Sequence, residues 1–258
     1  MSGAGAANVR VHVASIDTAP VTELCIRTMR RLAGAPFELV VGDCGSTDGS
    51  LEMLERFAAA GWLELEVAPN GRRHAEWLDQ WFASCPTRYA VFADSDVEFR
   101  REGWLRDMLA AAAAHDAALV ATRIQAVDGV AYRHPVTGAA RLLAARPEPW
   151  LVLLDVEALR GRVTAGFGYR DEPAPDVPGG KIAYDVGAAF FRDLDAQGLR
   201  WVEMPPDFAR AYHHYGGLSW QRPDRGIAFG RRMKQAVKRA AVEARLRRER
   251  RRAGPDTP

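Results

Sequence analysis

Lysine and cysteine are scarce in this chain of 258 residues. Three lysines stand against 32 arginines, an imbalance that we attribute to a GC-rich coding bias before any binding preference. The three cysteines, Cys25, Cys44 and Cys85, are odd in number and widely spaced. This spacing excludes a disulfide framework and a metal-binding pair, and it indicates a reducing, cytoplasmic environment.

The sequence also lacks long apolar runs, a leader-like start and internal repeats. No stretch approaches the roughly 20 apolar residues that a membrane-spanning helix needs. Residues 1–8 have no charged segment followed by an apolar core, so secretion is not expected. No segment of about 20 to 50 residues recurs, which excludes a repeat protein.

The overall composition is that of an ordinary globular protein, but the charge is unevenly distributed. Hydrophobic residues make up 48% and charged residues 26%, which excludes disordered and fibrous classes. The formal net charge is +2. Residues 222–252 hold 13 of the 35 basic and 3 of the 33 acidic residues, which gives +10 there and −8 in the remainder. The sequence therefore predicts a mildly acidic body with a basic tail.

Short apolar runs alternate with helical spacing from residue 9 to about residue 204. This alternation is typical of an α/β domain with a mainly parallel sheet flanked by helices. Apolar spacing predicts strands at residues 9–14, 37–41, 63–67, 89–93, 118–121, 150–154 and 199–204. It predicts helices at residues 21–32, 51–58, 74–85 and 186–194 and from residue 104 onward.

Two segments late in the chain have distinct patterns. Residues 161–181 are rich in glycine and proline and are expected to form a long loop that could close over a ligand. Asp185 and Gly198 bracket the apolar pattern of residues 186–194, so we expect them to cap that helix.

The basic tail is expected to be a helix from about residue 227 that packs loosely or projects. Its aromatic residues are too sparse for base stacking, so nucleic acid is not an expected partner. A solvated helix, a weak contact with an anionic membrane face and a protein contact stay open. A thin apolar stripe is more typical of packing on the same domain or a partner than of membrane insertion: Ile227, Phe229, Met233, Val237, Ala241 and Leu246.

Carboxylates follow three of the predicted strands. In open α/β sheets ligands bind at the carboxyl ends of the strands. Asp17 follows the first strand, Asp43 opens the segment after the second, and Asp94 and Asp96 follow the strand at residues 89–93. Two carboxylates one residue apart at a strand end project to the same side and offer the oxygen ligands that Mg²⁺ or Mn²⁺ require. Alone, the Asp-x-Asp pattern is also typical of a turn or a helix N-cap.

The ordered motifs resemble glycosyltransferase family 2, which has the Rossmann-like GT-A fold. The resemblance runs over residues 9–220 in the family's order, so we expect one domain at residues 9–221 and a separate tail at residues 222–258. The matching segments are Asp-Cys-Gly-Ser-Thr-Asp-Gly-Ser at 43–50, Phe-Ala-Asp-Ser-Asp-Val at 92–97, residues 152–160, Tyr-Asp-Val at 184–186 and His-His-Tyr-Gly-Gly-Leu-Ser at 213–219.

The resemblance implies a role for each matching position. Asp43 would recognise the donor base, Asp94 would lie near the ribose and sugar, and Asp96 would bind the metal. His214, or else His213, would complete the metal site; Tyr215 separates them from the glycines and shifts the register. Ser15, Asp17 and Arg73 would line the donor site, with Arg73 and a following helix N-terminus near the diphosphate.

Asp185 is the implied general base for the acceptor hydroxyl. The sequence departs from the family here, because Tyr184 occupies the position of the family's Glu and Gly187 that of a following acidic residue. A role for Asp185 as a helix cap is an equal alternative, and Asp171 and Glu172 are the reserve candidates.

The implied function is a metal-dependent, inverting glycosyltransferase that uses Mn²⁺ or Mg²⁺. Its partners would be a UDP, GDP or dTDP sugar donor and a hydroxyl acceptor, in the cytoplasm or at the inner face of the membrane. Two alternatives are a sugar-phosphate nucleotidyltransferase and a non-catalytic nucleotide-sugar-binding module with an anion-binding tail. Residues 14–20 argue against the nucleotidyltransferase, because they contain no glycine and no lysine.

Overall fold

The structure, a computed structural model, describes residues 8–68, 71–125, 131–133, 140–176, 179–216, 218 and 229–253. The chain divides into two compact units. The first comprises Met1–Arg72, Ala93–Asp107 and Pro206–Pro258, and the second comprises Arg73–Phe92 and Met108–Pro205. The division passes through strand β4 (Tyr89–Asp94) and helix α4 (Trp104–His115).

The first unit is built on three parallel strands. Its elements are β1 (Val9–Ser15), α1 (Ala19–Leu32), β2 (Glu38–Asp43), α2 (Ser50–Ala59), β3 (Glu64–Val67), β5 (Val97–Phe99), the 3₁₀ helix η1 (Pro206–Arg210), β15 (Tyr212–His214) and α7 (Phe229–Ala253). Valines of β1 and β2 are fully buried, as expected for central strands covered on both faces. The register sets Ser15 opposite Asp43, so the two strands end side by side.

The second unit contains most of the remaining strands. Its elements are α3 (His74–Ser84), β6 (Leu119–Ala121), β7 (Ile124–Gln125), β8 (Ala131–Arg133), β9 (Ala140–Leu143), β10 (Arg146–Pro147), β11 (Leu151–Asp155), α5 (Val156–Leu159), β12 (Arg170–Pro173), β13 (Lys181–Tyr184), α6 (Ala188–Ala196) and β14 (Trp201–Glu203). Stacked and edge-to-face aromatic contacts join Phe82, Phe92, Phe167 and Phe190 in its core.

The sheet confirms the predicted fold class. Its strand order is β14-β6-β11-β4-β1-β2-β3. The pairs β1–β2, β2–β3 and β14–β6 are parallel, and β11–β6 is antiparallel, so the sheet is mixed and mainly parallel. The predicted boundary between a domain at residues 9–221 and a tail at residues 222–258 stays a prediction.

Residues 161–181 are not one long loop as predicted. Strand β12 lies within this segment and pairs antiparallel with β13, which begins at its last residue, with Arg170 opposite Tyr184 and Pro173 opposite Lys181. The guanidinium of Arg170 lies over the ring of Tyr184, 5.3 Å from its centroid, and this contact stabilises the pair. Residues 177–178 lie outside the described part of the chain.

The predicted N-cap of α6 is also wrong. The helix begins after Gly187, which adopts a left-handed conformation with φ of 82°. Asp185 lies two residues earlier, where its carboxylate accepts a hydrogen bond from the Val186 N–H at 2.8 Å. At the other end the C-cap is Gln197, and Gly198 follows with φ of 65°, so the predicted glycine stop is confirmed one position beyond the cap.

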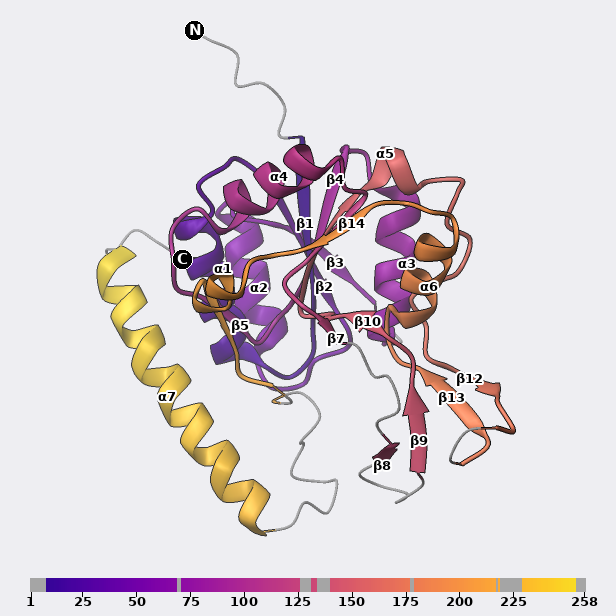
Figure 1. Ribbon diagram of the computed structural model, residues 1–258. Helices are drawn as coiled ribbons and strands as arrows, with labels where there is room; N and C mark the ends of the chain where they lie inside the picture. The colour runs from indigo at the N-terminus through magenta and orange to yellow at the C-terminus, as the bar shows by residue number, and fades with distance from the viewer. Residues whose placement is uncertain are drawn as a thin grey trace, which may run out of the picture. The chain divides into compact units, whose positions relative to one another are not determined.

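The basic tail does not project. Helix α7 packs along α1 within the first unit (Figure 1). Two ion pairs join the helices, Arg31 with Glu249 at 2.9 Å and Arg250 with Glu23. Burial alone would raise the pKa of Glu23, but hydrogen bonds from Arg250 and Arg27 outweigh it and leave the pKa below its ordinary value.

The apolar stripe predicted for the tail is only partly correct. Leu246 is buried as expected, together with Val242. Met233 and Val237, however, are 54% and 67% exposed. The packing face of the helix is displaced from the predicted stripe because α7 uses buried polar residues, Glu249 among them, as well as apolar ones.

Candidate functional site

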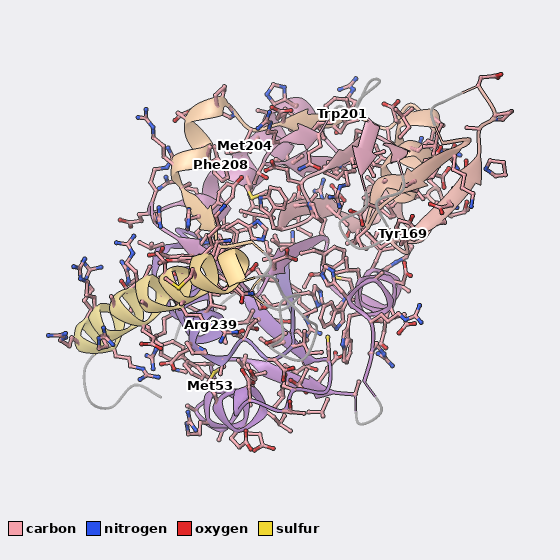
Figure 2. The ribbon with its side chains drawn as sticks, turned by 90° about the horizontal axis from the view of Figure 1, so that it is seen from below. Met53, Tyr169, Trp201, Met204, Phe208 and Arg239 are labelled. Atoms are coloured by element: carbon pink, nitrogen blue, oxygen red, sulfur yellow. The ribbon has the colours of Figure 1, made fainter. Side chains whose placement is uncertain are left out.

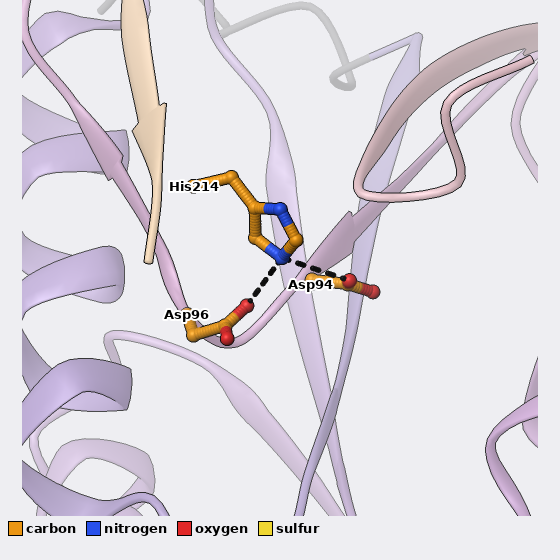
Figure 3. A group of neighbouring side chains, drawn as sticks. All are labelled: Asp94, Asp96 and His214. Atoms are coloured by element: carbon orange, nitrogen blue, oxygen red, sulfur yellow. Dashed lines mark ion pairs between the residues drawn. The ribbon is translucent and has the colours of Figure 1, made fainter. Parts of the chain in front are cut away.

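Three side chains that could hold a divalent cation converge at the end of β4. The Nε2 atom of His214 lies 3.0 Å from Asp96 Oδ1 and 3.6 Å from Asp94 Oδ2 (Figure 3). One ligand atom from each of the three residues lies within 4.8 Å of the others. Asp96 is buried, while Asp94 and His214 are partly exposed, so the group is open to solvent on one side.

Strand pairing brings His214 to the two carboxylates. Strand β15 pairs antiparallel with β5, which places His214 opposite Val97. The N–H of Tyr215 donates to the backbone oxygen of Asp96 at 2.9 Å and extends the pairing by one residue. His213, the other imidazole considered for the metal, points to the opposite side of the strand by alternation, and its ring lies edge-on to Tyr215 at 4.7 Å.

The donor set fits a hard divalent cation. Two carboxylates and one imidazole are the ligand types that suit Mn²⁺, and Mg²⁺ accepts the carboxylates. Cys25 lies nearby, with its Sγ donating to the backbone oxygen of Asp94 at 3.7 Å. Burial, and then the carboxylates of Asp96 and Asp94, raise the pKa of this thiol well above its ordinary value. The thiol therefore stays protonated and is not a thiolate ligand.

Asp43 is a buried carboxylate with one oxygen satisfied and one not. Its Oδ2 atom accepts hydrogen bonds from the N–H groups of Gly45 and Ser46, both at 2.9 Å. Its Oδ1 atom is buried and has no hydrogen-bond partner among the described residues. The residue is only 1% exposed. An unsatisfied carboxylate oxygen at such a position is costly, which indicates that a hydrogen-bond donor is missing.

The loops after β1 and β2 are tied together above Asp43. Asp17 adopts a left-handed conformation with φ of 48°, which turns its carboxylate toward the second loop. Its Oδ1 atom accepts from the Thr47 N–H at 2.6 Å, and its own N–H donates to Ser46 Oγ at 3.1 Å. Ser15 is fully buried, and its hydroxyl lies 3.1 Å from Thr22 Oγ1. Ser15 thus holds the start of α1 in place beneath the loop.

A cavity of about 620 Å³ lies beside these loops in the first unit. It is lined by Asp17, Thr18, Pro20, Val21, Thr47, Asp48, Leu218, Arg239, Val242 and Glu243. Arg239, labelled in Figure 2, is one of the three residues that α7 contributes. The tail helix therefore forms one wall of this cavity, which neither the motifs nor the charge pattern predicted.

The other predicted site residues lie in the second unit. Arg73 immediately precedes α3, as expected, and is exposed; its N–H donates to the Glu76 carboxylate at 2.9 Å. Gly217 and Ser219, from the matching segment at 213–219, lie outside the described residues.

Asp185 is paired with a cation that sequence reasoning missed. Its Oδ2 atom lies 3.1 Å from Nη2 of Arg146, which is mostly buried. Arg146 stands on the two-residue strand β10 and carries no motif, so only its contact identifies it. The carboxylate of Asp185 is 38% exposed and is reachable from solvent.

The reserve candidates Asp171 and Glu172 lie on β12 rather than in a loop. Asp171 accepts a hydrogen bond from the Tyr169 hydroxyl at 2.5 Å. Arg192 donates to Glu172 at 2.7 Å and thereby lowers the pKa of that carboxyl. A carboxylate held in this way is a weaker proton acceptor than one with a free oxygen.

Fold and site together define an α/β protein with an acidic metal-type site at its strand ends. The sequence model described as Glycosyl transferase family 2 matches residues 11–188, more than half of the chain. The chain therefore belongs to glycosyl transferase family 2. No match was found among curated proteins. Among the described helices, none is long and apolar enough to cross a membrane.

Solved structures share the GT-A fold with this chain. The mannosyltransferase PcManGT from Pyrobaculum calidifontis, in complex with GDP-Man and Mn²⁺, is 18% identical with a TM-score of 0.56 over 98% of this chain and 66% of that chain. Glucosyl-3-phosphoglycerate synthase from Mycobacterium tuberculosis, in complex with phosphoglyceric acid, is 17% identical with a TM-score of 0.51 over 93% of this chain and 80% of that chain. This chain thus spans about two thirds of the mannosyltransferase.

Proposed function

We propose that the protein is a metal-dependent glycosyltransferase that moves a sugar from a nucleotide diphosphate donor to an acceptor hydroxyl. The convergence of Asp94, Asp96 and His214 at a strand end, in a chain of glycosyl transferase family 2, is the observation that carries this proposal. Asp94-Ser95-Asp96 is then the DXD motif of the enzyme.

These three residues would hold Mn²⁺ or Mg²⁺. The ion would supply positive charge to the diphosphate as it leaves. Asp96, the most buried of the three, would be the principal ligand, Asp94 would lie near the ribose and sugar as well as the metal, and His214 would complete the set. We assign no metal contact to His213, since it points away from the two carboxylates.

Asp43 would read the donor base. Its unsatisfied Oδ1 atom can accept one N–H from a base such as uracil, thymine or guanine, which keeps UDP, dTDP and GDP sugars as candidate donors. Because this oxygen is buried in the free protein, residues around it must move for a base to reach it. Ser15 supports the same loop from beneath, and Arg73 is proposed to meet the diphosphate.

Asp185 is the proposed general base of an inverting transfer. Its carboxylate would take the proton of the acceptor hydroxyl while that oxygen attacks the anomeric carbon from the face opposite the leaving nucleotide. The ion pair with Arg146 engages Oδ2, and Oδ1, which accepts from the Val186 N–H, keeps a second lone pair for the acceptor hydroxyl. Three buried cysteines, none of them in a disulfide among the described residues, match the reducing cytoplasm in which we place the enzyme.

A donor panel tests the proposal. Purified protein is incubated with UDP, GDP and dTDP sugars and Mn²⁺, and release of the nucleoside diphosphate is measured. We expect one donor to be turned over, and Asp96→Ala to lower turnover by at least about 100-fold. Asp116→Asn is the matched control, because Asp116 is a highly exposed carboxylate in an ion pair with Arg200. Equal turnover by Asp96→Ala and wild type would contradict the mechanism.

A further inference from the structure

We infer that α7 acts as a clasp that positions His214 for the metal, through Tyr215 and Glu98. Lys238 and Arg245 of α7 are the positioning residues. The inference rests on the proposed metal site, and it concerns a part of the chain beyond residues 11–188, the stretch that the family model matches. It gives the basic tail a role in the site that needs no external anionic partner.

Tyr215 directly follows His214 and is held at each of its polar groups. Its N–H donates to the backbone oxygen of Asp96 at 2.9 Å, and its hydroxyl donates to Glu98 Oε2 at 2.9 Å. Its backbone oxygen accepts from the Nζ of Lys238, which also donates to the Gly216 oxygen at 2.8 Å. Because the peptide bond is planar, fixing the Tyr215 backbone leaves few rotatable backbone bonds by which the His214 imidazole could change position.

The ring of Tyr215 is buried, with 4% exposure, in an apolar cluster that α7 helps to build. The cluster consists of Val21, Leu24, Tyr215, Leu218, Val242 and Leu246. Two of its members come from α7 and two from α1. Tyr215, the residue that follows His214, is therefore packed between the tail helix and α1.

Glu98 links the same strand to α7 by charge. Its Oε1 atom lies 2.7 Å from Nε of Arg245, and its Oε2 atom accepts from Arg100 at 2.9 Å as well as from Tyr215. Glu98 is 4% exposed, so these partners are needed to stabilise its buried carboxylate. It also sits next to Val97, the residue opposite His214 in the β5–β15 pair.

The clasp has a firm base. Farther along α7, Glu249 pairs with Arg31, and Arg250 pairs with the buried Glu23. These contacts fix the helix on α1, so Lys238 and Arg245 act from a rigid support. Strand β15, in contrast, has three residues and pairs with a three-residue strand, a length that is marginal without further packing.

The test is Mn²⁺ affinity, measured on the full chain by electron paramagnetic resonance without any donor. Lys238→Met and Arg245→Met remove the charge and keep an apolar stem, and Arg248→Met is the matched control on an exposed position of the same helix. Loss of a group that orients a metal ligand weakens affinity by about 10- to 100-fold. We expect about tenfold weaker binding for the two clasp variants and wild-type binding for the control.

A double-mutant cycle separates positioning from general destabilisation. His214→Ala weakens Mn²⁺ binding by itself, and in its background Lys238→Met should add no further loss, because the clasp acts through His214. Hydrogen exchange of the peptide at residues 212–216 should accelerate in the clasp variants only. Arg245→Lys and Lys238→Arg, which keep the charge, should recover part of the affinity and guard against loss by misfolding.

The outcomes distinguish this inference from the proposed function. If wild-type protein binds Mn²⁺ and the clasp variants bind it more weakly, but no sugar is transferred, the proposed function is refuted and the inference about the clasp stands. Clasp variants that bind Mn²⁺ as tightly as wild type, or that lose the same factor in the His214→Ala background, would overturn the clasp. A wild type that binds no Mn²⁺ would overturn both.

Discussion

Replacing Asp43 by asparagine should invert the base preference of the nucleotide site. In the structure, Asp43 Oδ2 accepts from two backbone N–H groups and Oδ1 has no partner. An asparagine must present its oxygen to the same N–H groups, which puts its NH₂ where Oδ1 was. The substitution therefore changes an acceptor into a donor at almost constant volume, and two donors then face each other when uracil binds.

The magnitude follows from the kind of hydrogen bond that is lost. A hydrogen bond to a charged group contributes about 1.5–3 kcal/mol. The affinity for UDP, whose uracil offers an N–H, should therefore fall by roughly 10- to 100-fold. CDP is the comparison ligand, because cytosine has an acceptor at the same ring position. Its binding should be unchanged or tighter, since the new NH₂ can donate to it.

Isothermal titration of UDP, GDP and CDP into both proteins, with Mn²⁺ present, measures this effect. The thermal midpoint of Asp43→Asn should equal or exceed that of wild type, because the variant removes a buried charge with an unsatisfied oxygen. An equal loss for UDP and CDP, or no loss for any nucleotide, would refute the reasoning that Asp43 reads the base. A large drop in thermal midpoint would show that its role is structural.

Three further predictions concern stability and turnover. Burial, and then the charge of Arg10, lower the pKa of His12 to about 3, so below about pH 6.5 His12 becomes protonated in the unfolded chain but stays neutral in the folded chain. The free energy of unfolding should therefore fall by about 2 kcal/mol between pH 7 and pH 5. In chemical denaturation, His12→Gln should not show that loss. Glu23→Gln breaks the buried pairing with two arginines and should cost about 3 kcal/mol of stability in the same assay; a cost near zero would mean that the pairing is dispensable. Asp185→Asn should lower turnover by at least about 100-fold and leave donor affinity unchanged. If the variant lowers donor affinity but not turnover, Asp185 is not the general base.

The sequence predicts the strand–helix alternation because each element has a clear period. Buried valines mark β1 and β2, and the helical spacing of Leu24, Cys25 and Met29 marks α1. Strand β12 reads Arg-Asp-Glu-Pro and has no apolar residue that could reveal it. Its pairing depends on contacts with β13, such as Arg170 over Tyr184, and such contacts are invisible to a local pattern.

The candidate site also contains residues that the sequence predicts and residues that it does not. Asp94 and Asp96 follow a recognisable apolar strand, so the sequence locates them without the structure. Which histidine joins them depends on the register of a three-residue strand, and a shift of one residue would exchange His213 for His214. The partner of Asp185, Arg146, is separated from it by about 40 positions of chain and cannot be predicted by spacing.

The contact face of α7 could not be predicted from the helical spacing of its apolar residues. The predicted stripe counted apolar side chains, but the contact face is decided by Glu249 and Arg250, which meet opposite charges on α1. Long charged side chains cover apolar surface with their stems while their charged ends pair, so charge alone does not identify the solvent face.

The scarcity of lysine makes the attachment of α7 directly observable by chemical labelling. Among the three amine side chains, Lys181 and Lys234 are exposed, while Lys238 is half-buried and its ammonium is engaged by backbone oxygens. An amine-acylating reagent should thus modify Lys234 quickly and Lys238 slowly, although they lie one helical turn apart. The ratio of Lys238 to Lys234 labelling, measured by mass spectrometry, reports how often the helix detaches. The arginines on its surface do not react with the reagent.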